Sequence, residues 1–325
     1  MTAPDDVVEL ARLRAAARES KDFAEADSLR DRIAELGWAV IDSADGFTLE
    51  PHEQPLRTGP TPAGDVPSAL DEEPIADVAI HWVAEGWLDD IERAAAAFRA
   101  NTGSRRLQLV IADVTGDAAG RWSHVDDVEV VSLQPGTGWA AARNAGLRRS
   151  RAPIVIAVDG SIEATGDVFA PIEAALQDPK IGVCGPFGIV TRDLREFDEA
   201  PEPGPCDAIE GYLMAFRRET LSRVGGFDEK YRWYRTADIE WSFRVKDAGL
   251  GCSVVPVPVV KHTHRMWQAA TERQRASWSK RNFYRFLDRF RDRWDLVLAG
   301  EPEHHEHDDD HEHHHEHPVT MPEGR

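Results

Sequence analysis

The residues of this chain best suited to acid–base or phosphate chemistry follow short apolar segments. Asp113 comes just after the run at 107–111, and the triplet Asp159-Gly160-Ser161 comes just after the run at 154–158. Asp238 stands near the start of a later segment with helical spacing. A carboxylate can remove a proton from a hydroxyl, or bind a divalent cation together with phosphate oxygens. These residues predict one site if the fold brings them together.

Alternating elements between residues 76 and 190 would do so. Short runs rich in β-branched residues stand at 78–80, 107–111, 128–131 and 154–158, and helices are expected at 86–100, 138–149 and 167–177. The alternation predicts an α/β fold with a mostly parallel sheet and covering helices. Ligands of such sheets bind beyond the carboxyl ends of the strands, where Asp113 and Asp159 stand.

Further elements follow this region. Residues 207–265 predict a strand, a helix, a loop, a second helix and a strand, and 266–298 predict one or two basic amphipathic helices. One stripe of aromatic side chains at helical spacing runs along the last segment: Phe283, Phe286, Phe290 and Trp294. This stripe predicts a buried face.

Three segments flank the α/β region. Residues 1–50 predict a helical hairpin followed by a β-hairpin, and the six prolines of 51–75 predict a linker. Residues 299–325 predict a disordered tail, because 301–317 hold eight His and eight acidic residues with no Lys or Arg. The tail either binds metal ions through neutral imidazoles or is a solvated end, and both interpretations stay open.

Composition excludes several classes of protein. The 325 residues are 42% apolar and carry a net charge of −20, which argues against nucleic acid as a partner. No apolar run approaches the ~20 residues of a transmembrane helix, and the acidic start argues against a secretory signal. The three cysteines imply no disulfide framework. The cytoplasm is the expected compartment.

Motifs between residues 76 and 298 resemble those of family 2 glycosyltransferases. They are Gly138-Trp-Ala-Ala-Ala-Arg-Asn-Ala-Gly146, Val158-Asp-Gly-Ser161, Val224-Gly-Gly-Phe-Asp-Glu229, Ala237-Asp-Ile-Glu-Trp241 and Lys261-His-Thr-His264. The resemblance implies the GT-A fold over 76–265, a Rossmann-like mixed sheet with flanking helices. It also implies inverting transfer of a sugar from a nucleotide diphosphate sugar to an acceptor hydroxyl.

The same resemblance implies the catalytic residues. Asp238 matches the general base of the family, and Glu240 is a second candidate, although Ala237 stands where the family usually has Glu. An alternative reading of Asp238 as the N-cap of a helix over 239–249 stays open. Glu210, Asp228 and Trp241 are expected on the acceptor side, and core packing is the alternative for Trp241.

For the donor, the resemblance assigns Asp113, Arg143, Asp159 and Ser161 to nucleotide-sugar binding. The family's Asp-x-Asp metal motif is Asp-Gly-Ser in this chain, and a hydroxyl is a weak metal ligand. A divalent cation, Mg2+ or Mn2+, is therefore expected to bind weakly at Asp159 and His262. Otherwise cationic side chains replace it: Arg143, His262, His264 and Arg265. The alternatives, a strand-ending role for Asp113 and a polar turn at 159–161, stay open.

The resemblance implies classes of donor and acceptor rather than one substrate. It implies a UDP- or GDP-type donor and a glycan, lipid-linked or small-molecule acceptor. The basic segment 273–293 is compatible with a place at the inner face of the membrane. A homo-oligomer is compatible with the sequence as well.

The N-terminal segment resembles the C-terminal end of cysteinyl-tRNA synthetases. Residues 17–31, then Leu36-Gly37 and 42–46, carry the resemblance, and no catalytic part of a synthetase accompanies them. Six basic and twelve acidic residues in 1–50 argue against tRNA binding. The sequence predicts a docking or dimerisation element.

Two other functions remain in view. Because Ser161 and Ala237 replace expected acidic residues, the chain could be a non-catalytic relative that binds a nucleotide sugar or a glycan and acts as a partner. A metal-handling protein that acts through its His-rich tail is the third hypothesis.

Overall fold

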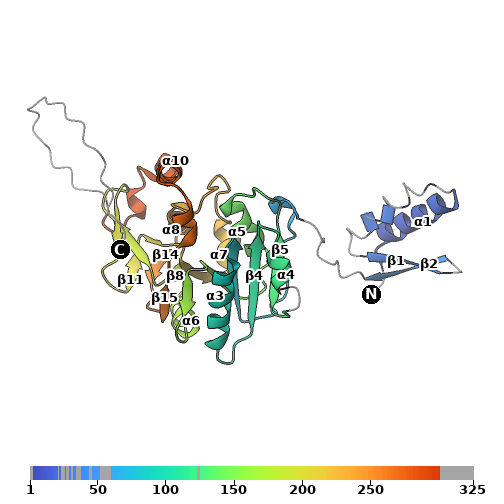
Figure 1. Ribbon diagram of the computed structural model, residues 1–325, viewed down its shortest axis with the longest axis horizontal. Helices are drawn as coiled ribbons and strands as arrows, with labels where there is room; N and C mark the ends of the chain where they lie inside the picture. The colour runs from blue at the N-terminus through green and yellow to red at the C-terminus, as the bar shows by residue number, and fades with distance from the viewer. Residues whose placement is uncertain are drawn as a thin grey trace, which may run out of the picture.

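The computed structural model describes residues 3–20, 22, 26, 29–30, 32–33, 38–43, 46–51, 60–122 and 125–300 (Figure 1). They form a small unit up to residue 51 and a large unit from residue 60 onward. The tail 301–325 lies outside the described residues. So do several residues of the expected second N-terminal helix and its turn, including Phe23, Glu25 and Gly37.

In the small unit, helical residues pack on a β-hairpin. Helix α1 (Asp5–Glu19) packs on the antiparallel strands β1 (Trp38–Ser43) and β2 (Gly46–Pro51), which confirms the expected β-hairpin. Its core contains Val7, Ala11, Ile33 and Trp38. No residue of the large unit belongs to this cluster.

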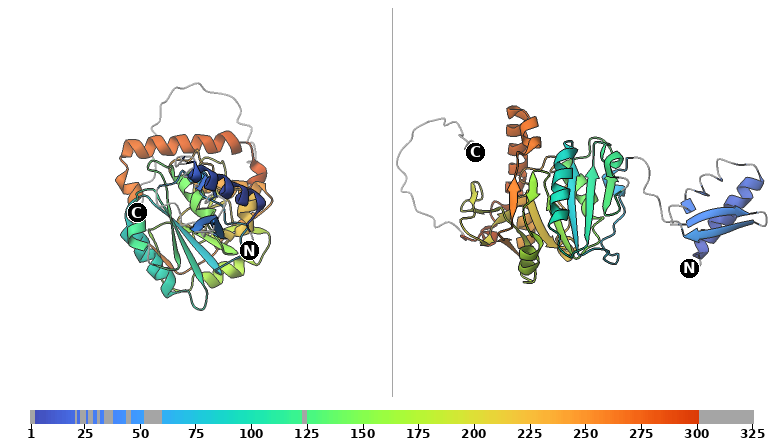
Figure 2. Two further views of the ribbon diagram at one scale, coloured as in Figure 1. Left: turned by 90° about the vertical axis from the view of Figure 1, so that its right-hand side faces the viewer. Right: turned by 60° about the horizontal axis from the view of Figure 1, so that its bottom comes forward.

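An eight-stranded mixed sheet runs through the large unit in the order β11-β14-β8-β13-β6-β3-β4-β5 (Figure 2). Its first four strands along the chain are parallel neighbours: β3 (Val78–Ala84), β4 (Leu107–Asp113), β5 (Val128–Ser132) and β6 (Ile154–Val158). Strand β13 (Leu213–Arg217) lies antiparallel between β6 and β8 (Ile181–Gly185), and β14 (Gly251–Val254) is parallel to β8. At the edge, β11 (Gly204–Cys206) pairs antiparallel with β14.

Helices cover both faces of this sheet. One face packs on α3 (Leu88–Ala100), α4 (Ala118–Trp122) and α6 (Phe169–Leu176), around Trp82 and Phe98. The other packs on α5 (Trp139–Leu147), α7 (Arg218–Val224) and α8 (Ala237–Asp247). The alternation of apolar runs with helical segments predicted this layering, because strands covered on both faces are mostly apolar.

The prolines of 51–75 predicted a linker. The segment 60–75 is instead part of the large unit. Thr61 forms a bridge with Leu133 beside β5, and the short helix η1 (Ala63–Asp65) follows. Ala63 and Val66 are buried against the sheet. Proline removes hydrogen-bond donors without preventing apolar packing, so proline content alone misplaced this boundary.

The last elements of the described chain are α9 (Arg265–Ala269), α10 (Glu272–Phe290) and η2 (Trp294–Leu296). Thr271 and Gln274 form a capping box at the start of α10. The expected aromatic stripe is confirmed, because Phe286 and Phe290 are buried against Phe243 of α8. Asn282 donates hydrogen bonds to the carbonyls of Trp233 and Arg235 and so ties α10 to the loop before α8.

Short strands complete the large unit. Strand β7 (Ile162–Ala164) pairs with β15 (Val259–Lys261), and β9 (Gly188–Thr191) pairs with β10 (Phe197–Glu199) and β12 (Ala208–Ile209). Among the described residues, no helix combines the length and apolarity required to cross a bilayer.

Candidate active site

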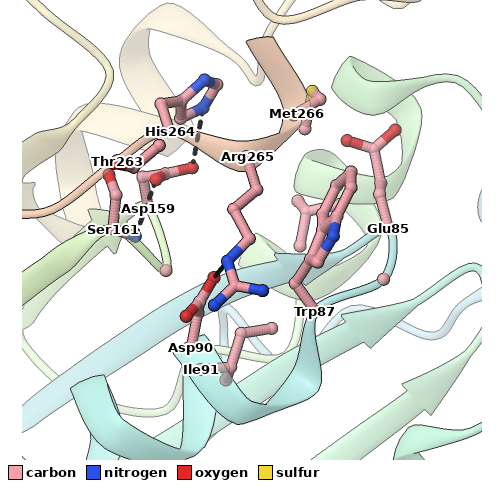
Figure 3. Close-up of a pocket in the computed structure, with 13 residues that line it drawn as sticks. Glu85, Trp87, Asp90, Ile91, Asp159, Ser161, Thr263, His264, Arg265 and Met266 are labelled. Carbon is pink, nitrogen blue, oxygen red and sulfur yellow. Dashed lines mark hydrogen bonds and ion pairs between the residues drawn. The ribbon is translucent and has the colours of Figure 1, made fainter. Parts of the chain in front are cut away.

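The carboxyl ends of β3 and β6 border a small cavity (Figure 3). Its volume is about 40 Å³, which leaves room for one or two water molecules. The segment 263–266 closes the opposite side. Charged side chains dominate the lining: Glu85, Asp90, Asp159, His264 and Arg265. The cavity lies where ligands of α/β sheets bind, but a phosphate group would fit only after a side chain moves.

Asp159 is held by two partners at this cavity. Its Oδ1 accepts a hydrogen bond from the Ser161 backbone at 2.8 Å, and its Oδ2 lies 3.2 Å from His264 Nε2. Burial raises the pKa of Asp159, but the bonds and charge from His264 and Ser161 outweigh burial and lower it. Asp159 is therefore an anion at neutral pH. The Ser161 hydroxyl is buried and has no hydrogen-bond partner.

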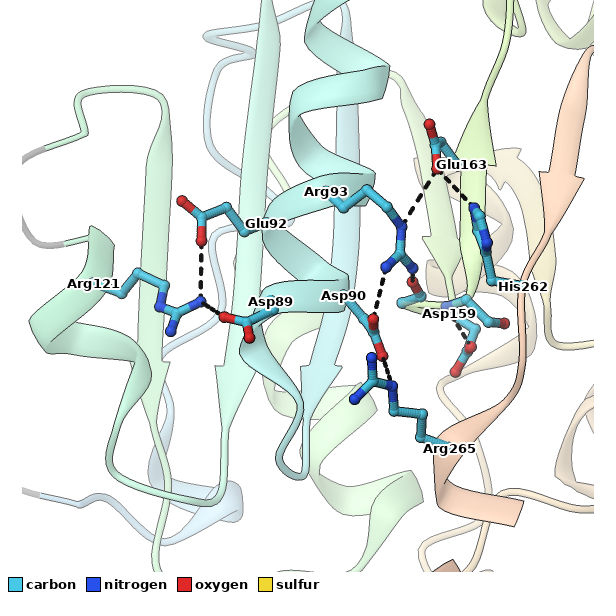
Figure 4. Close-up of polar contacts among 11 residues, drawn as sticks. Asp89, Asp90, Glu92, Arg93, Arg121, Asp159, Glu163, His262 and Arg265 are labelled. Carbon is cyan, nitrogen blue, oxygen red and sulfur yellow. Dashed lines mark hydrogen bonds and ion pairs between the residues drawn. The ribbon is translucent and has the colours of Figure 1, made fainter. Parts of the chain in front are cut away.

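His262 belongs to a separate network (Figure 4). Its Nε2 lies 2.7 Å from Glu163 Oε2, and Glu163 lies 3.4 Å from Arg93 Nε. Arg93 also contacts Asp90, whose other oxygen lies 2.9 Å from Arg265 Nε. His262 therefore contacts Glu163, whereas His264 is the imidazole beside Asp159, and the expected weak metal site at Asp159 and His262 stays a prediction.

Glu85 follows β3 directly, and its pKa is raised. Its Oε2 is buried without a hydrogen-bond partner. Burial raises the pKa of Glu85 to about 7, with Asp159 raising it further and the positive charge of Arg143 opposing the rise. This side chain therefore titrates close to neutral pH.

Two further carboxylates, Asp238 and Glu210, lie near the N-terminus of α8. Asp238 Oδ2 accepts a hydrogen bond of 2.7 Å from the Gly211 backbone, and its pKa is raised by burial. Burial and the charge of Asp238 raise the pKa of Glu210 to about 7. Helix α8 begins at Ala237 after the N-cap Thr236, so Asp238 does not cap the helix.

Two tyrosines connect Asp159 with this carboxylate pair. The rings of Tyr212 and Tyr234 lie 5.7 and 4.6 Å from the His264 ring. Burial, together with the charges of Glu210, Asp159 and Asp238, raises the pKa of Tyr212 to about 12. Backbone contacts connect the two aspartates through this segment, because the Asp159 N–H donates to the Tyr212 carbonyl at 3.0 Å and the neighbouring Gly211 N–H donates to Asp238. Because β13 is antiparallel to β6, the residues before β13 lie at the edge where β6 ends.

The expected nucleotide-binding residues Asp113 and Arg143 have partners within the fold. Asp113 is buried, and its carboxylate accepts hydrogen bonds from the Thr115 and Ala118 backbones. This matches the strand-ending alternative. Arg143 is also buried, and its Nη1 donates to the His81 carbonyl at 2.7 Å and contacts His81 Nδ1 at 2.9 Å. Neither side chain lines the cavity.

Three further candidates lie away from Asp238. Glu240 is buried and forms ion pairs of 2.9 Å with Arg244 and with Arg289 of α10. Trp241 is buried in the core, where it stacks on Phe227 at 5.5 Å, so the core-packing alternative is correct. Asp228 accepts a hydrogen bond from the Lys230 backbone in a turn.

The sequence analysis missed Glu85, Asp90 and Tyr212. Glu85 stands directly after a strand, as Asp113 and Asp159 do, so the same rule could have found it. Asp90 and Tyr212 carried no such signal. Asp90 acquires its role only through Arg265, which lies 175 positions later.

A larger cavity of about 440 Å³ adjoins the first, and both are lined by Glu85, Trp87 and Met266. Its other walls come from the loop 230–233 and from α9 and α10. The two cavities therefore share one wall.

Both units are similar to known proteins. Residues 3–48 match the family described as the cysteinyl-tRNA ligase anticodon binding domain. A cysteine–tRNA ligase of Opitutus terrae is 52% identical over 48 residues, which are 15% of this chain and 10% of the ligase.

The large unit is similar to glycosyltransferases. GalNAc-T7, solved with UDP, GalNAc and Mn2+, superposes with a TM-score of 0.55 and 15% identity over 66% of this chain and 48% of that one. The large unit has the GT-A fold. An N-acetylglucosaminyl-diphospho-decaprenol L-rhamnosyltransferase of Mycobacterium tuberculosis is 27% identical over 170 residues, half of this chain. The chain matches a tenth of the ligase and 54% of the rhamnosyltransferase.

Proposed function

We propose that this protein transfers a sugar from a nucleotide diphosphate sugar to an acceptor hydroxyl, with inversion at the anomeric carbon. The observation that carries the proposal is the chain of contacts that links Asp159, His264, Tyr212 and, through Gly211, Asp238 where β6 ends and β13 begins. The similarity to a rhamnosyltransferase supports the same reaction class.

In this proposal Asp238 is the general base. The acceptor hydroxyl gives its proton to the carboxylate of Asp238 while its oxygen forms a bond to the anomeric carbon. The bond between that carbon and the diphosphate oxygen breaks on the opposite face, and its electron pair leaves with the diphosphate. Burial favours this role because it raises the pKa of Asp238. Glu240 is excluded as the base by its two arginine partners.

The charge on the leaving diphosphate needs a cationic partner. GT-A relatives suggest a divalent cation, yet the described residues contain no group of three His, Cys, Asp or Glu side chains that could hold one. At Asp159 the place beside the carboxylate is taken by His264. We therefore assign the stabilisation of the leaving group to His264 and Arg265, which both line the cavity. Arg265 must first leave Asp90.

The acceptor is proposed from the relative's chemistry. The rhamnosyltransferase is named for a diphospho-decaprenol acceptor, and a lipid-linked sugar would suit the basic helix α10 as well. A protein acting on such an acceptor would work at the inner face of the membrane. The N-terminal unit is proposed to be a docking or dimerisation element.

A second candidate function is binding without catalysis. Ser161 and Ala237 stand where the family has acids, and the Arg265–Asp90 ion pair crosses a cavity of only about 40 Å³. These features favour a nucleotide-sugar or glycan-binding partner protein.

Turnover separates the two functions. The full chain is incubated with a panel of nucleotide diphosphate sugars and a lipid-linked N-acetylglucosamine acceptor, with EDTA or Mn2+, and nucleoside diphosphate release is measured. We expect release in both conditions. Saturable donor binding without release from any donor would favour the binding protein.

A further inference from the structure

The larger cavity combines aromatic walls with unpaired cations. Its volume of about 440 Å³ is in the range of small-molecule sites. Trp233 and Trp278 form an edge-to-face pair at 5.2 Å, and Trp233 also stacks on Trp267 at 5.8 Å. Trp233 and Trp278, from the loop before α8 and from α10, line the cavity, and Trp267 packs on Trp233 without lining it.

Three cations line the same cavity: Lys230, Arg232 and Arg281. All three side chains are exposed, and among the described residues none has a carboxylate within ion-pair distance. Arg232 donates to the Gly136 carbonyl at 2.6 Å, which fixes its guanidinium. In a chain with a net charge of −20, cations gathered without acidic partners indicate an anionic ligand.

An unpartnered polar group supports the same conclusion. Trp233 is only 8% exposed, and its Nε1–H has no hydrogen-bond partner. A buried donor without an acceptor costs about 1–3 kcal/mol, but this nitrogen is not exposed, so a ligand oxygen could accept from it only after the indole turns. The backbone of Trp233 is fixed by Asn282, which donates a hydrogen bond to its carbonyl.

The position of the cavity connects it with the proposed reaction centre. Glu85, Trp87 and Met266 line both this cavity and the smaller one that contains Asp159 and His264. A ligand that fills the larger cavity can therefore extend a phosphate toward His264 and Arg265. A carboxylate whose pKa is about 7, Glu85, stands at the junction and adds little repulsion when protonated.

We infer that the larger cavity binds a phosphorylated ring compound, with its phosphate on Lys230, Arg232 and Arg281 and its ring against Trp233 and Trp278. Guanidinium and ammonium groups bind phosphate oxygens, and aromatic faces pack on sugar or base rings. The inference rests on the proposed function for the choice of ligand. Two sources share this chemistry, namely the nucleoside diphosphate of the donor and the sugar diphosphate of a lipid-linked acceptor.

Isothermal titration calorimetry on the full chain tests the inference. The probes are UDP, GDP and a short-chain prenyl-diphospho-N-acetylglucosamine, each titrated into the wild type, the double variant Lys230→Ala/Arg281→Ala and Trp278→Ala. Arg273→Ala is the matched control, because Arg273 is an exposed arginine of α10 that does not line the cavity. Circular dichroism verifies that each variant is folded.

We expect at least one probe to bind and the double variant to weaken it by about tenfold or more, with Arg273→Ala unchanged. Preference for UDP or GDP assigns the cavity to the donor, and preference for the prenyl diphosphate assigns it to the acceptor. Equal loss in Arg273→Ala, or binding only to phosphatidylglycerol vesicles, would overturn the inference. So would the absence of binding by all three probes.

Binding is measured without turnover, so the inference and the proposed transferase activity fail separately. Probe binding that depends on Lys230 and Arg281, in a protein that transfers no sugar, would leave the cavity assignment intact and refute the enzyme. Sugar transfer that is unaffected in the double variant, in KM as well as kcat, would refute the cavity and keep the enzyme.

Discussion

The two histidines of the Lys261-His-Thr-His264 motif contact different carboxylates. His264 is paired with Asp159, whereas His262 is paired with Glu163 at the surface. Side chains two positions apart would share a face on a continuing strand, but β15 ends at Lys261 and the chain turns. Their spacing therefore could not reveal which one faces the cavity.

This difference gives a matched pair of variants. We expect His264→Gln to lower kcat by about 10²-fold, because the imidazole that would donate to the leaving diphosphate is lost. His262→Gln should stay close to the wild type, since its ring binds only Glu163. Steady-state kinetics on both variants provides the measurement, and a larger loss in His262→Gln would contradict the assignment.

The acidity of Glu85 makes stability depend on pH. Its pKa is about 7 in the folded protein and about 4.5 when unfolded, so the folded state binds the proton more tightly. The free energy of unfolding therefore falls as pH rises from about 4.5 to 7 and stays lower above that range.

Glu85→Gln removes this loss because its amide does not ionise. We expect the variant to gain about 1–3 kcal/mol over the wild type at pH 8, and little at pH 4.5. Urea denaturation at both pH values measures the gain. Glu196→Gln serves as the control, because Glu196 is exposed and its side chain forms no hydrogen bond or ion pair with the described residues. An equal gain at both pH values would refute the pKa assignment.

At the scale of elements, α5 lies against β3 through Gly146. A Cβ at this position would come within 1.7 Å of His81 Nε2. The His81 ring cannot turn aside easily, because it is buried and held by Arg143. Burial and the neighbouring charge of Arg143 also lower the pKa of His81 well below its usual value.

Gly146→Ala is therefore expected to destabilise the large unit by about 3 kcal/mol or more. The control is Gly120→Ala in α4, where a Cβ would meet no atom within 4 Å. Thermal unfolding compares the two. A Gly146→Ala variant as stable as Gly120→Ala would mean that α5 and β3 are packed differently.

Much of the architecture could be predicted from local patterns. The apolar runs at 107–111 and 154–158 became β4 and β6, because buried parallel strands are apolar on both faces. Asp159 could be placed by the same rule. Glu240 could not, because its partner Arg289 belongs to a helix 49 positions away. Asp113 was ambiguous, since a strand-ending turn and a ligand contact both use an acid after a strand.

At the scale of the whole molecule, each unit has its own core. The apolar clusters of the small unit contain only residues up to Leu49, and those of the large unit begin at Ala63. We expect deletion of residues 1–51 to leave the unfolding temperature and kcat of the large unit unchanged. Any effect should appear in the sedimentation of the protein, if the small unit mediates docking or dimerisation. Loss of folding on deletion would contradict this independence.

The most direct test of the proposed chemistry is the Asp238→Asn variant, which keeps one oxygen to accept the Gly211 hydrogen bond, loses the oxygen that accepts from the Ile239 backbone, and cannot remove a proton. With a donor that the wild type uses, we predict an unchanged dissociation constant and a loss of kcat of at least about 10²-fold. Asp228→Asn, in its turn away from Asp238, should retain activity. Turnover by Asp238→Asn at the wild-type rate would contradict the account.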